Sequence, residues 1–373
     1  MASSQAISYT LTINGTPVPQ TLIASIQMLQ VEDHAEMADL LRIKLTVGVR
    51  PDGSGWTVLD DDMFPRLANL VVKGKIGNAA ETLINSYVIE TQVNFSTQPG
   101  QTVLTVVAMD PSVLMNLEEK VRPWPDMSDS DIAAAIFSEY GFAAEVKDSQ
   151  PVRPDNEHRT MQRSTDIQFL QQLAKRNGYE CYVETAPTGE IAGHFHPPKT
   201  DQKPQGVLTV NMGQDTNVSA FTVRNDMLRP TTVKVKGLEV ESLSDQPAES
   251  QQQSDDAMGS GTALAAERPR VVLLTGNGLA RAGELQTAAQ AVVDRSGWAI
   301  RAEGELNAST YGAVLRAKRT VSVRGVGRVL SGTYYVDRVL HIFTSEGWTQ
   351  RFSLRRNAVG LTGRESFQED NSL

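Results

Sequence analysis

Short runs in which apolar and polar residues alternate recur through the first hundred residues, and this period of two constrains the fold more than any other feature. Residues 41–47 read LRIKLTV, with an apolar side chain at every second position. The same alternation occurs at residues 9–13 and 103–109 and at Tyr87, Ile89, Val93 and Phe95. Because successive side chains on a strand point to opposite faces, each run predicts a strand with one buried and one wetted face.

Turn signals separate these runs. Asn14-Gly15 favours the positive φ angles of a two-residue hairpin turn, which predicts a return strand through Val18. Glycines and acidic residues, including a run of three aspartates, fill residues 51–62 and predict an exposed loop. Several short strands at this spacing are typical of a barrel or a sandwich.

The pattern changes to a helical period in the middle of the chain. Ser128 or Ser130 is placed to cap a helix over residues 131–140, with Ile132, Ile136 and Phe137 facing inward. A second helix is predicted over about residues 165–177, with Gly178 ending it. A hairpin of strands follows at residues 180–184 and 189–195, so this region reads as α+β.

The last part of the chain returns to strands. They are predicted at residues 207–210, 220–223, 232–236, 320–323, 334–340 and 349–354. Residues 242–269 carry few large apolar side chains and predict a flexible excursion, which is followed by a third helix. The apolar face of that helix consists of Leu285, Ala288, Ala289, Val292 and Val293.

Composition excludes several classes of protein. The 373 residues include 40% hydrophobic and 21% charged residues, which is enough to bury substantial cores. No apolar run reaches eighteen residues, and the first residues lack the pattern of a secretion signal, so we expect neither stable membrane insertion nor export by that route. The net charge of −9 argues against specific nucleic-acid recognition. The single cysteine, Cys181, predicts a buried and inert thiol.

Candidate chemistry is sparse. His194 and His196 alternate on a predicted strand and would face the same side, where two imidazoles can chelate a metal. No carboxylate or cysteine lies nearby at ligand spacing, so we expect solvent exposure at a strand end and no metal site. Glycines at 276–278 and 325–327 fit neither the dinucleotide fingerprint nor the P-loop and predict loops. We therefore expect no catalytic residues and no cofactor.

One segment resembles a known family. Residues 162–174 read QRSTDIQFLQQLA, followed by Gly178 and an aromatic strand, and are similar to a segment of phage late control D proteins and VgrG-type spike proteins. Residues 104–110, 132–142, 332–341 and 352–357 resemble further blocks of the family in the same order. The matching positions, structural rather than catalytic, are Gln162, Thr165, Asp166, Phe169, Leu170, Leu173, Gly178, Tyr182, Gly332, Tyr334, Val336 and His341.

The resemblance implies a mainly β fold with an α+β insertion, built from two tail-tube-like β-barrel domains and assembled as a pseudo-six-fold trimer. The implied boundaries are a first barrel at 5–115, an α+β region at 116–200, a second barrel at 206–358 with a flexible and helical insertion at 242–317, and a polar tail at 359–373. No spike stem is evident in the chain, so the spike is expected to be a separate polypeptide.

The implied function is a non-enzymatic baseplate hub that joins a hexameric tail tube to a trimeric central spike in a contractile phage tail or a related injection system. The implied partners are two further copies of the chain, the tail tube protein, the separate spike, and baseplate wedge and tape-measure proteins. Such a protein would be assembled in the producer cytoplasm and reside in the particle baseplate. Two alternatives stay open, namely a tail-associated cell-wall hydrolase and a receptor- or glycan-binding tail module.

Overall fold

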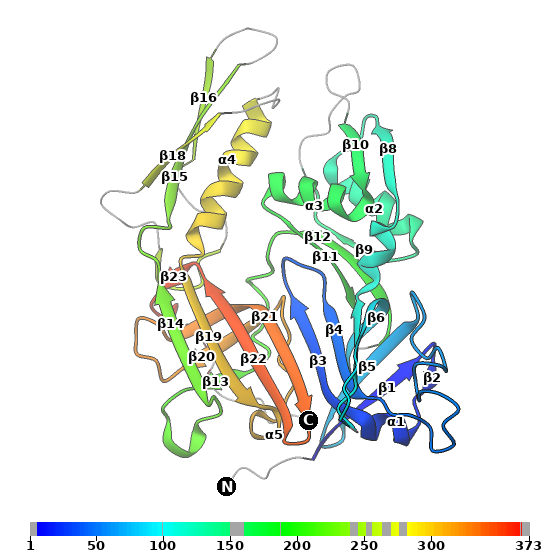
Figure 1. Cartoon of the computed structure of the whole chain (residues 1–373). Helices are drawn as coiled ribbons and strands as arrows, with labels where there is room; N and C mark the ends of the chain where they lie inside the picture. Colours follow the sequence, from blue (N-terminus) through cyan, green and yellow to red (C-terminus); the bar gives the residue numbers. More distant parts are fainter. Residues whose placement is uncertain are drawn as a thin grey trace.

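The computed structural model describes residues 6–98, 100–149, 160–186, 188–238, 245–250, 256–262, 270–275, 282–365 and 367. Its largest element is a 13-stranded sheet that combines strands from both ends of the chain, and Figure 1 shows the two sets of strands side by side. The sheet order is β14-β19-β22-β21-β3-β4-β7-β6-β5-β1-β2, and β20 and β13 extend from β21 beside this path. The fold is mainly β, as predicted.

The N-terminal half contains the alternating runs. Its elements are β1 (Ile7–Ile13), β2 (Thr16–Pro17), α1 (Gln20–Ser25), β3 (Ile26–His34), β4 (Leu40–Thr46), β5 (Asn69–Ile76), β6 (Ala79–Asn94) and β7 (Val103–Met109). Asn14 and Gly15 both have positive φ angles, 49° and 78°, which confirms the predicted hairpin turn. Leu41, Ile43 and Leu45 of β4 are buried and its lysine and arginine are exposed, as the alternation predicts.

Along β6 and just after it, the predicted buried face is wrong at Ile89 and Phe95, whereas Val93 packs against the core of this half. Ile89 and Phe95 are 41% and 67% exposed, whereas Ile84 and Val88 are buried. The pairing of β6 with β7 shifts register between Val88 and Glu90, so a β-bulge reverses which residues face the core.

The C-terminal half supplies the remaining strands of the large sheet. Its elements are β13 (Val207–Thr209), β14 (Ala220–Asn225), β19 (Ile300–Asn307), α5 (Ala308–Tyr311), β20 (Thr320–Arg324), β21 (Gly332–Thr344) and β22 (Gly347–Arg356), with the short strands β17 (Gly261–Thr262) and β23 (Ala358–Val359) paired at its margin. The strand pairings of the described residues do not close either half into a barrel.

A smaller α+β region lies above the N-terminal half in Figure 1. Its elements are η1 (Pro111–Asn116), β8 (Glu119–Trp124), α2 (Asp129–Glu139), β9 (Ala143–Val146), β10 (Thr160–Thr165), α3 (Asp166–Asn177), β11 (Glu180–Thr185) and β12 (Ile191–His196). A capping box begins α2, in which the Ser128 hydroxyl accepts from the Asp131 N–H, and Gly178 in the left-handed conformation ends α3. Both helices lie where the sequence predicts them.

A second outlying unit extends from the C-terminal half. It consists of β15 (Thr231–Leu238), β16 (Asp245–Ser250), β18 (Arg270–Thr275) and α4 (Ala282–Gly297). The prediction of a flexible excursion over 242–269 was wrong for β16, because its backbone pairs antiparallel with β15 and this ladder does not require large apolar side chains. The glycines at 276–278 lie outside the described residues.

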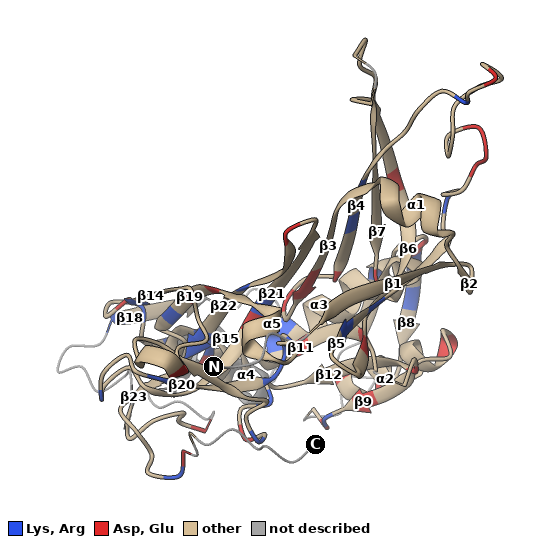
Figure 2. Cartoon of the chain, turned by 90° about the horizontal axis from the view of Figure 1, so that it is seen from below, with Lys and Arg blue, Asp and Glu red and all other residues tan. Residues whose placement is uncertain are grey.

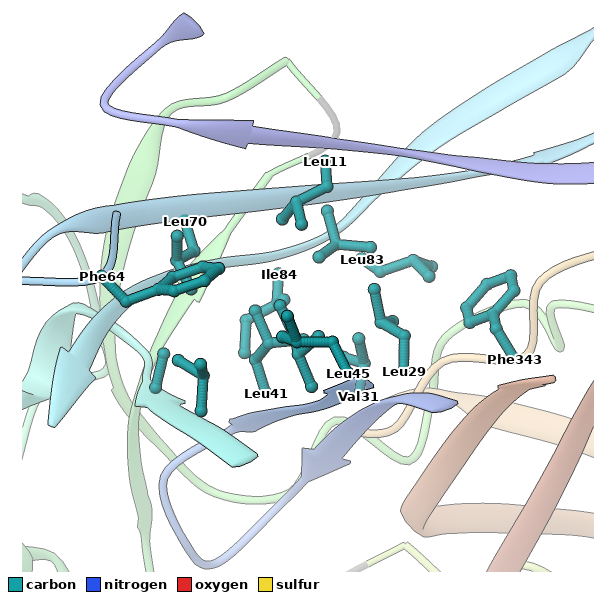
Figure 3. Close-up of a cluster of buried hydrophobic side chains, with 14 of the residues drawn as sticks. Leu11, Leu29, Val31, Leu41, Leu45, Phe64, Leu70, Leu83, Ile84 and Phe343 are labelled. Atoms are coloured by element: carbon teal, nitrogen blue, oxygen red, sulfur yellow. The ribbon is translucent and has the colours of Figure 1, made fainter. Parts of the chain in front are cut away.

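The apolar core of the N-terminal half also takes in side chains from the C-terminal half. Figure 3 shows the cluster of the N-terminal half, where Leu29, Leu41 and Leu45 point toward Leu83 and Leu11 from facing strands. Separate clusters fill the α+β region and the C-terminal half. No helix within the described residues is long and apolar enough to cross a membrane. The domain boundaries drawn from the sequence stay predictions.

Candidate functional site

The two halves of the chain meet along β3 and β21, and we call this contact the seam. These strands pair antiparallel over six residue pairs, from Arg338 opposite His34 to Phe343 opposite Leu29. Phe343 and Trp348 belong to the C-terminal half but pack in the core of the N-terminal half, where Phe343 lies beside Leu29 in Figure 3. The seam therefore joins the halves by backbone pairing and by a shared core.

A buried ion cluster lies at the seam. The Lys318 Nζ is 2.8 Å from Asp33 Oδ1 and 2.9 Å from both carboxylate oxygens of Asp39. The Arg316 Nε is 3.1 Å from Asp33 Oδ2, and the Asp39 N–H donates to Asp110 Oδ2 at 2.6 Å. Each of these five residues is at most 5% exposed. The cations come from the C-terminal half and the acids from the N-terminal half, so the cluster stabilises only the joined arrangement.

The pKa values of these acids move in opposite directions. Burial opposes ionisation of Asp33, but Lys318 and Arg316 outweigh it and hold its pKa below the ordinary value. Burial raises the pKa of Asp39 well above the ordinary value, since Asp33 and Asp110 add to the shift and Lys318 only partly offsets it. Burial also raises the pKa of Asp110. Arg316 also lies 3.7 Å from Glu81 and 3.8 Å from Glu184, so its charge is shared among several acids.

Arg355 joins the third part of the fold to the other two. Its guanidinium, on β22, pairs with Glu180 of β11 and lies 2.7 Å from Glu36 of the N-terminal half. The Tyr335 hydroxyl donates to the second oxygen of Glu180 at 2.7 Å. Burial raises the pKa of Glu180 to about 7, against the opposing effect of Arg355. A single buried arginine therefore contacts residues from all three parts of the chain.

The structure brings most of the predicted family positions of the α+β region together around the start of α3. Asp166, 1% exposed, accepts from Gln162 at 2.7 Å and from the Tyr140 hydroxyl at 2.7 Å. The Thr165 side chain does not cap the helix, because its hydroxyl donates to Asn116 instead. Phe169, Leu170 and Leu173 are buried in the core of this region, and Gly178 ends the helix.

The remaining family positions lie at or near the seam. Tyr182 lies on β11 with its ring 5.0 Å from Lys318 Nζ. Gly332, Tyr334, Val336 and His341 follow one another along β21. A Cβ at Gly332 would lie 2.4 Å from Arg356, whose guanidinium donates to the Ser331 and Met258 carbonyls. Tyr334, Val336 and His341 are fully buried, and their assignment as family positions stays a prediction.

The histidine pair differs from its prediction. His194 and His196 are 5% and 6% exposed, so the expectation of solvent exposure was wrong. Tyr182 stacks on His194 at 4.5 Å, and the pairing of β12 with β11 and β9 covers the pair. Glu145 of β9, far away in sequence, lies opposite His194 and supplies the carboxylate that sequence spacing did not reveal. Cys181 is buried as predicted, and burial raises the pKa of its thiol to about 12.

Sequence reasoning missed the ion cluster, although one signal was present. Leu29, Val31 and Asp33 occupy alternate positions of β3 and all face the core. An acid in phase with buried apolar residues indicates a buried charge that needs a cation. The partner, Lys318, lies 285 residues away in sequence, and only the fold places it there.

Solved structures share this fold. A prophage 43 kDa tail protein from Shewanella oneidensis is 14% identical, with 95% of this chain and 100% of that chain covered and a TM-score of 0.68. A tail protein from Neisseria meningitidis is 10% identical, with coverages of 94% and 97% and a TM-score of 0.65. A component of the E. coli type VI secretion system, described as similar to two T4 bacteriophage tail proteins, is 11% identical, with coverages of 96% and 79% and a TM-score of 0.56.

At such low identities these likenesses show a common fold. No curated protein sequence matches the chain. The model of one protein family, described as the Alg8 N-terminal domain, matches residues 3–345. This match covers most of the chain, and the chain therefore belongs to the Alg8 N-terminal domain family.

Proposed function

We propose that the chain is a structural component of a phage tail or related injection machine, and that it acts there as the hub between a hexameric tail tube and a trimeric spike. The observation that carries this proposal is the seam, which fixes two β-rich halves side by side in one sheet. Three such chains would together present six β units, which match the six-fold symmetry of a tube above. The three-fold symmetry of the assembly would match a trimeric spike below. The assignment to late control D and VgrG-like hubs is part of this proposal.

The similar tail and secretion proteins support a place in such an assembly, because their fold is shared over nearly the whole chain. The partners we propose are two further copies, the tube protein, a separate spike, and wedge and tape-measure proteins. Contacts that survive tail contraction would bury on the order of 2,000 Å² or more. Basic and acidic residues are interspersed over both halves in Figure 2, which does not favour a nucleic-acid surface.

We also propose that the chain is not an enzyme. Asp33, Asp39 and Glu180 are buried and paired with lysine or arginine, as expected of groups that stabilise a fold. Incubating the chain with purified cell-wall peptidoglycan should release no soluble fragments, whereas a tail-borne hydrolase would release them. A glycan array tests the receptor-binding alternative: we expect no binding, whereas a receptor-binding module would bind particular glycans.

The deciding experiment is mass photometry of the purified chain, alone and mixed with its tube and spike neighbours. A trimer that caps tube rings or captures the spike is the expected result. A chain that stays monomeric at high concentration and ignores both neighbours would overturn the hub proposal.

A further inference from the structure

Glu145, His194 and His196 form a cluster with the donor atoms of a metal site. His194 and His196 share one face of β12, and Glu145 is the Cα partner of His194 on the parallel strand β9. Cross-strand partners present their side chains on the same face, so three separate backbone positions direct their donors to one point. Their ligand atoms all lie within 4.8 Å of one another.

The distances approach those between ligands around a small metal ion. The His194 Nδ1 is 3.2 Å from His196 Nε2 and 3.5 Å from Glu145 Oε2. Ligands bound tetrahedrally at about 2.0–2.1 Å lie about 3.3–3.4 Å apart. A single position therefore reaches both imidazole nitrogens and the carboxylate with only small side-chain adjustments.

The contacts of the ring nitrogens that face away from the cluster decide which nitrogens can act as metal ligands. The second nitrogen of His196, Nδ1, lies 2.7 Å from the Pro197 carbonyl, so it carries the proton and donates, and the Nε2 lone pair faces His194. The second nitrogen of His194, Nε2, faces Glu184 at 3.9 Å. The His196 contact is a hydrogen bond, whereas 3.9 Å between His194 Nε2 and Glu184 is too long for one, so His194 Nδ1 offers a lone pair to an ion in the tautomer that carries its proton on Nε2.

The site is open on one side. A cavity of about 730 Å³, lined in part by Glu145, His196 and Lys199, gives solvent access to the cluster. Lys199 Nζ is 2.7 Å from Glu145 Oε2 and would compete with a cation for this oxygen. An incoming divalent cation would take over this oxygen and release the lysine.

We propose that Glu145, His194 and His196 bind one zinc ion per chain, with solvent at the fourth position. Two imidazoles and one carboxylate are ligands that Zn²⁺ accepts in tetrahedral geometry. The ion would tie β9 to the end of β12, immediately before the connection to the C-terminal half. This inference stands apart from the proposed hub function, since it rests only on the α+β region.

The competing arrangement is a plain hydrogen bond, in which His194 Nδ1–H donates to His196 Nε2. Isothermal titration of the full chain with zinc chloride, after chelator treatment and removal of any affinity tag, separates the two. Zinc binding at one equivalent per chain is expected, with visible absorption typical of tetrahedral coordination when cobalt replaces zinc. No binding up to millimolar zinc would overturn the proposal.

Variants identify the ligands. Glu145→Gln and His196→Gln should each weaken zinc binding at least tenfold, whereas Lys199→Met should strengthen it by removing the competing cation. Glu190→Gln, an exposed acid in the turn between β11 and β12, is the matched control and should leave binding unchanged. Glu145 is 52% exposed, so its variant tests the site even if a histidine variant fails to fold. Binding that is equal in the parent, Glu145→Gln and His196→Gln would show surface association only and overturn the assignment.

Discussion

At the scale of single residues, the chain buries charged side chains and fixes their positions through the backbone. Lys318, just before β20, is the clearest case, because it is 3% exposed and adopts a positive φ of 64°, which is uncommon outside glycine. Its backbone N–H donates to the Val336 carbonyl at 2.9 Å, so this conformation is fixed on both the backbone and the side-chain side. The residue is thus held in place to meet Asp33 and Asp39.

Replacing Lys318 with methionine tests the ion cluster. Loss of the ammonium leaves Asp33 and Asp39 buried without their main cation, and such losses reduce the free energy of unfolding by about 3–5 kcal/mol. Urea denaturation followed by circular dichroism measures the change. The control is Lys75→Met on the exposed face of β5, which should change stability by less than about 0.5 kcal/mol. Equal losses in the two variants would contradict the role of the cluster.

His341 predicts a pH dependence. Burial lowers its pKa to about 3, with Arg316 adding to the shift, whereas an unfolded imidazole titrates near about 6.5. The unfolded chain therefore binds a proton first as the pH falls, and the stability present above about pH 6.5 is lost progressively toward pH 3. Neither ring nitrogen has a hydrogen-bond partner among the described residues, so the folded state gains little from keeping this imidazole.

In His341→Leu this source of acid sensitivity is removed. Between pH 6 and pH 5 the parent should lose about 1 kcal/mol more of its free energy of unfolding than the variant. Denaturant titrations of both proteins at the two pH values measure the difference. Parallel pH profiles would mean that the pKa of His341 is the same in the folded and unfolded states.

At the scale of elements, helices were easier to predict than strands. The start of α2 follows from the capping residue Ser128 and the end of α3 from Gly178, both local signals. The strands β3 and β5 were not predicted, although buried side chains occupy every second position of β5 in the structure. Strand pairing depends on partners far away in sequence, and the bulge in β6 shows how one extra residue defeats a period-two reading.

Because Gly193 has no side chain, the Phe137 ring of α2 can pack closely against β12. A Cβ at this position would lie 2.2 Å from Phe137, so the helix rests directly on the strand backbone. Gly193→Ala should therefore lower the free energy of unfolding by about 1–3 kcal/mol through overpacking. Gly48→Ala is the control, because nothing lies within 4 Å of its added methyl group. Thermal unfolding of both variants measures the effect, and an unchanged Gly193 variant would mean that α2 moves freely.

At the scale of the whole molecule, the sequence predicted a mainly β fold with an α+β insertion but not how its halves join. The family positions proposed around α3 lie close together in sequence, so a local pattern was enough to name them, and their assignment stays a prediction. The seam, the Arg355 contacts and the Glu145 carboxylate beside the histidines were not, because each depends on residues brought together only by the complete fold.

Trp348 provides a test of the joined halves. Its ring, from β22, would lie 2.5 Å from a Cβ added to Gly74 on β5, so it fills a space in the opposite half. Trp348→Ala should reduce the free energy of unfolding by about 3–5 kcal/mol and should speed hydrogen exchange in β5 as well as β22. Mass spectrometry of peptides from both strands measures this, with peptides of α2 as the internal control. Faster exchange confined to β22 would contradict a shared core.

The antiparallel pairing at the seam has a mechanical consequence. The hydrogen bonds between β3 and β21 run perpendicular to the strands over six residue pairs. Tension applied along the strands loads all of these bonds at once in shear, whereas tension applied across them would open them one at a time. The two halves therefore resist sliding past each other, because all of these bonds would have to break together. They separate most readily under a force that peels them apart from one end.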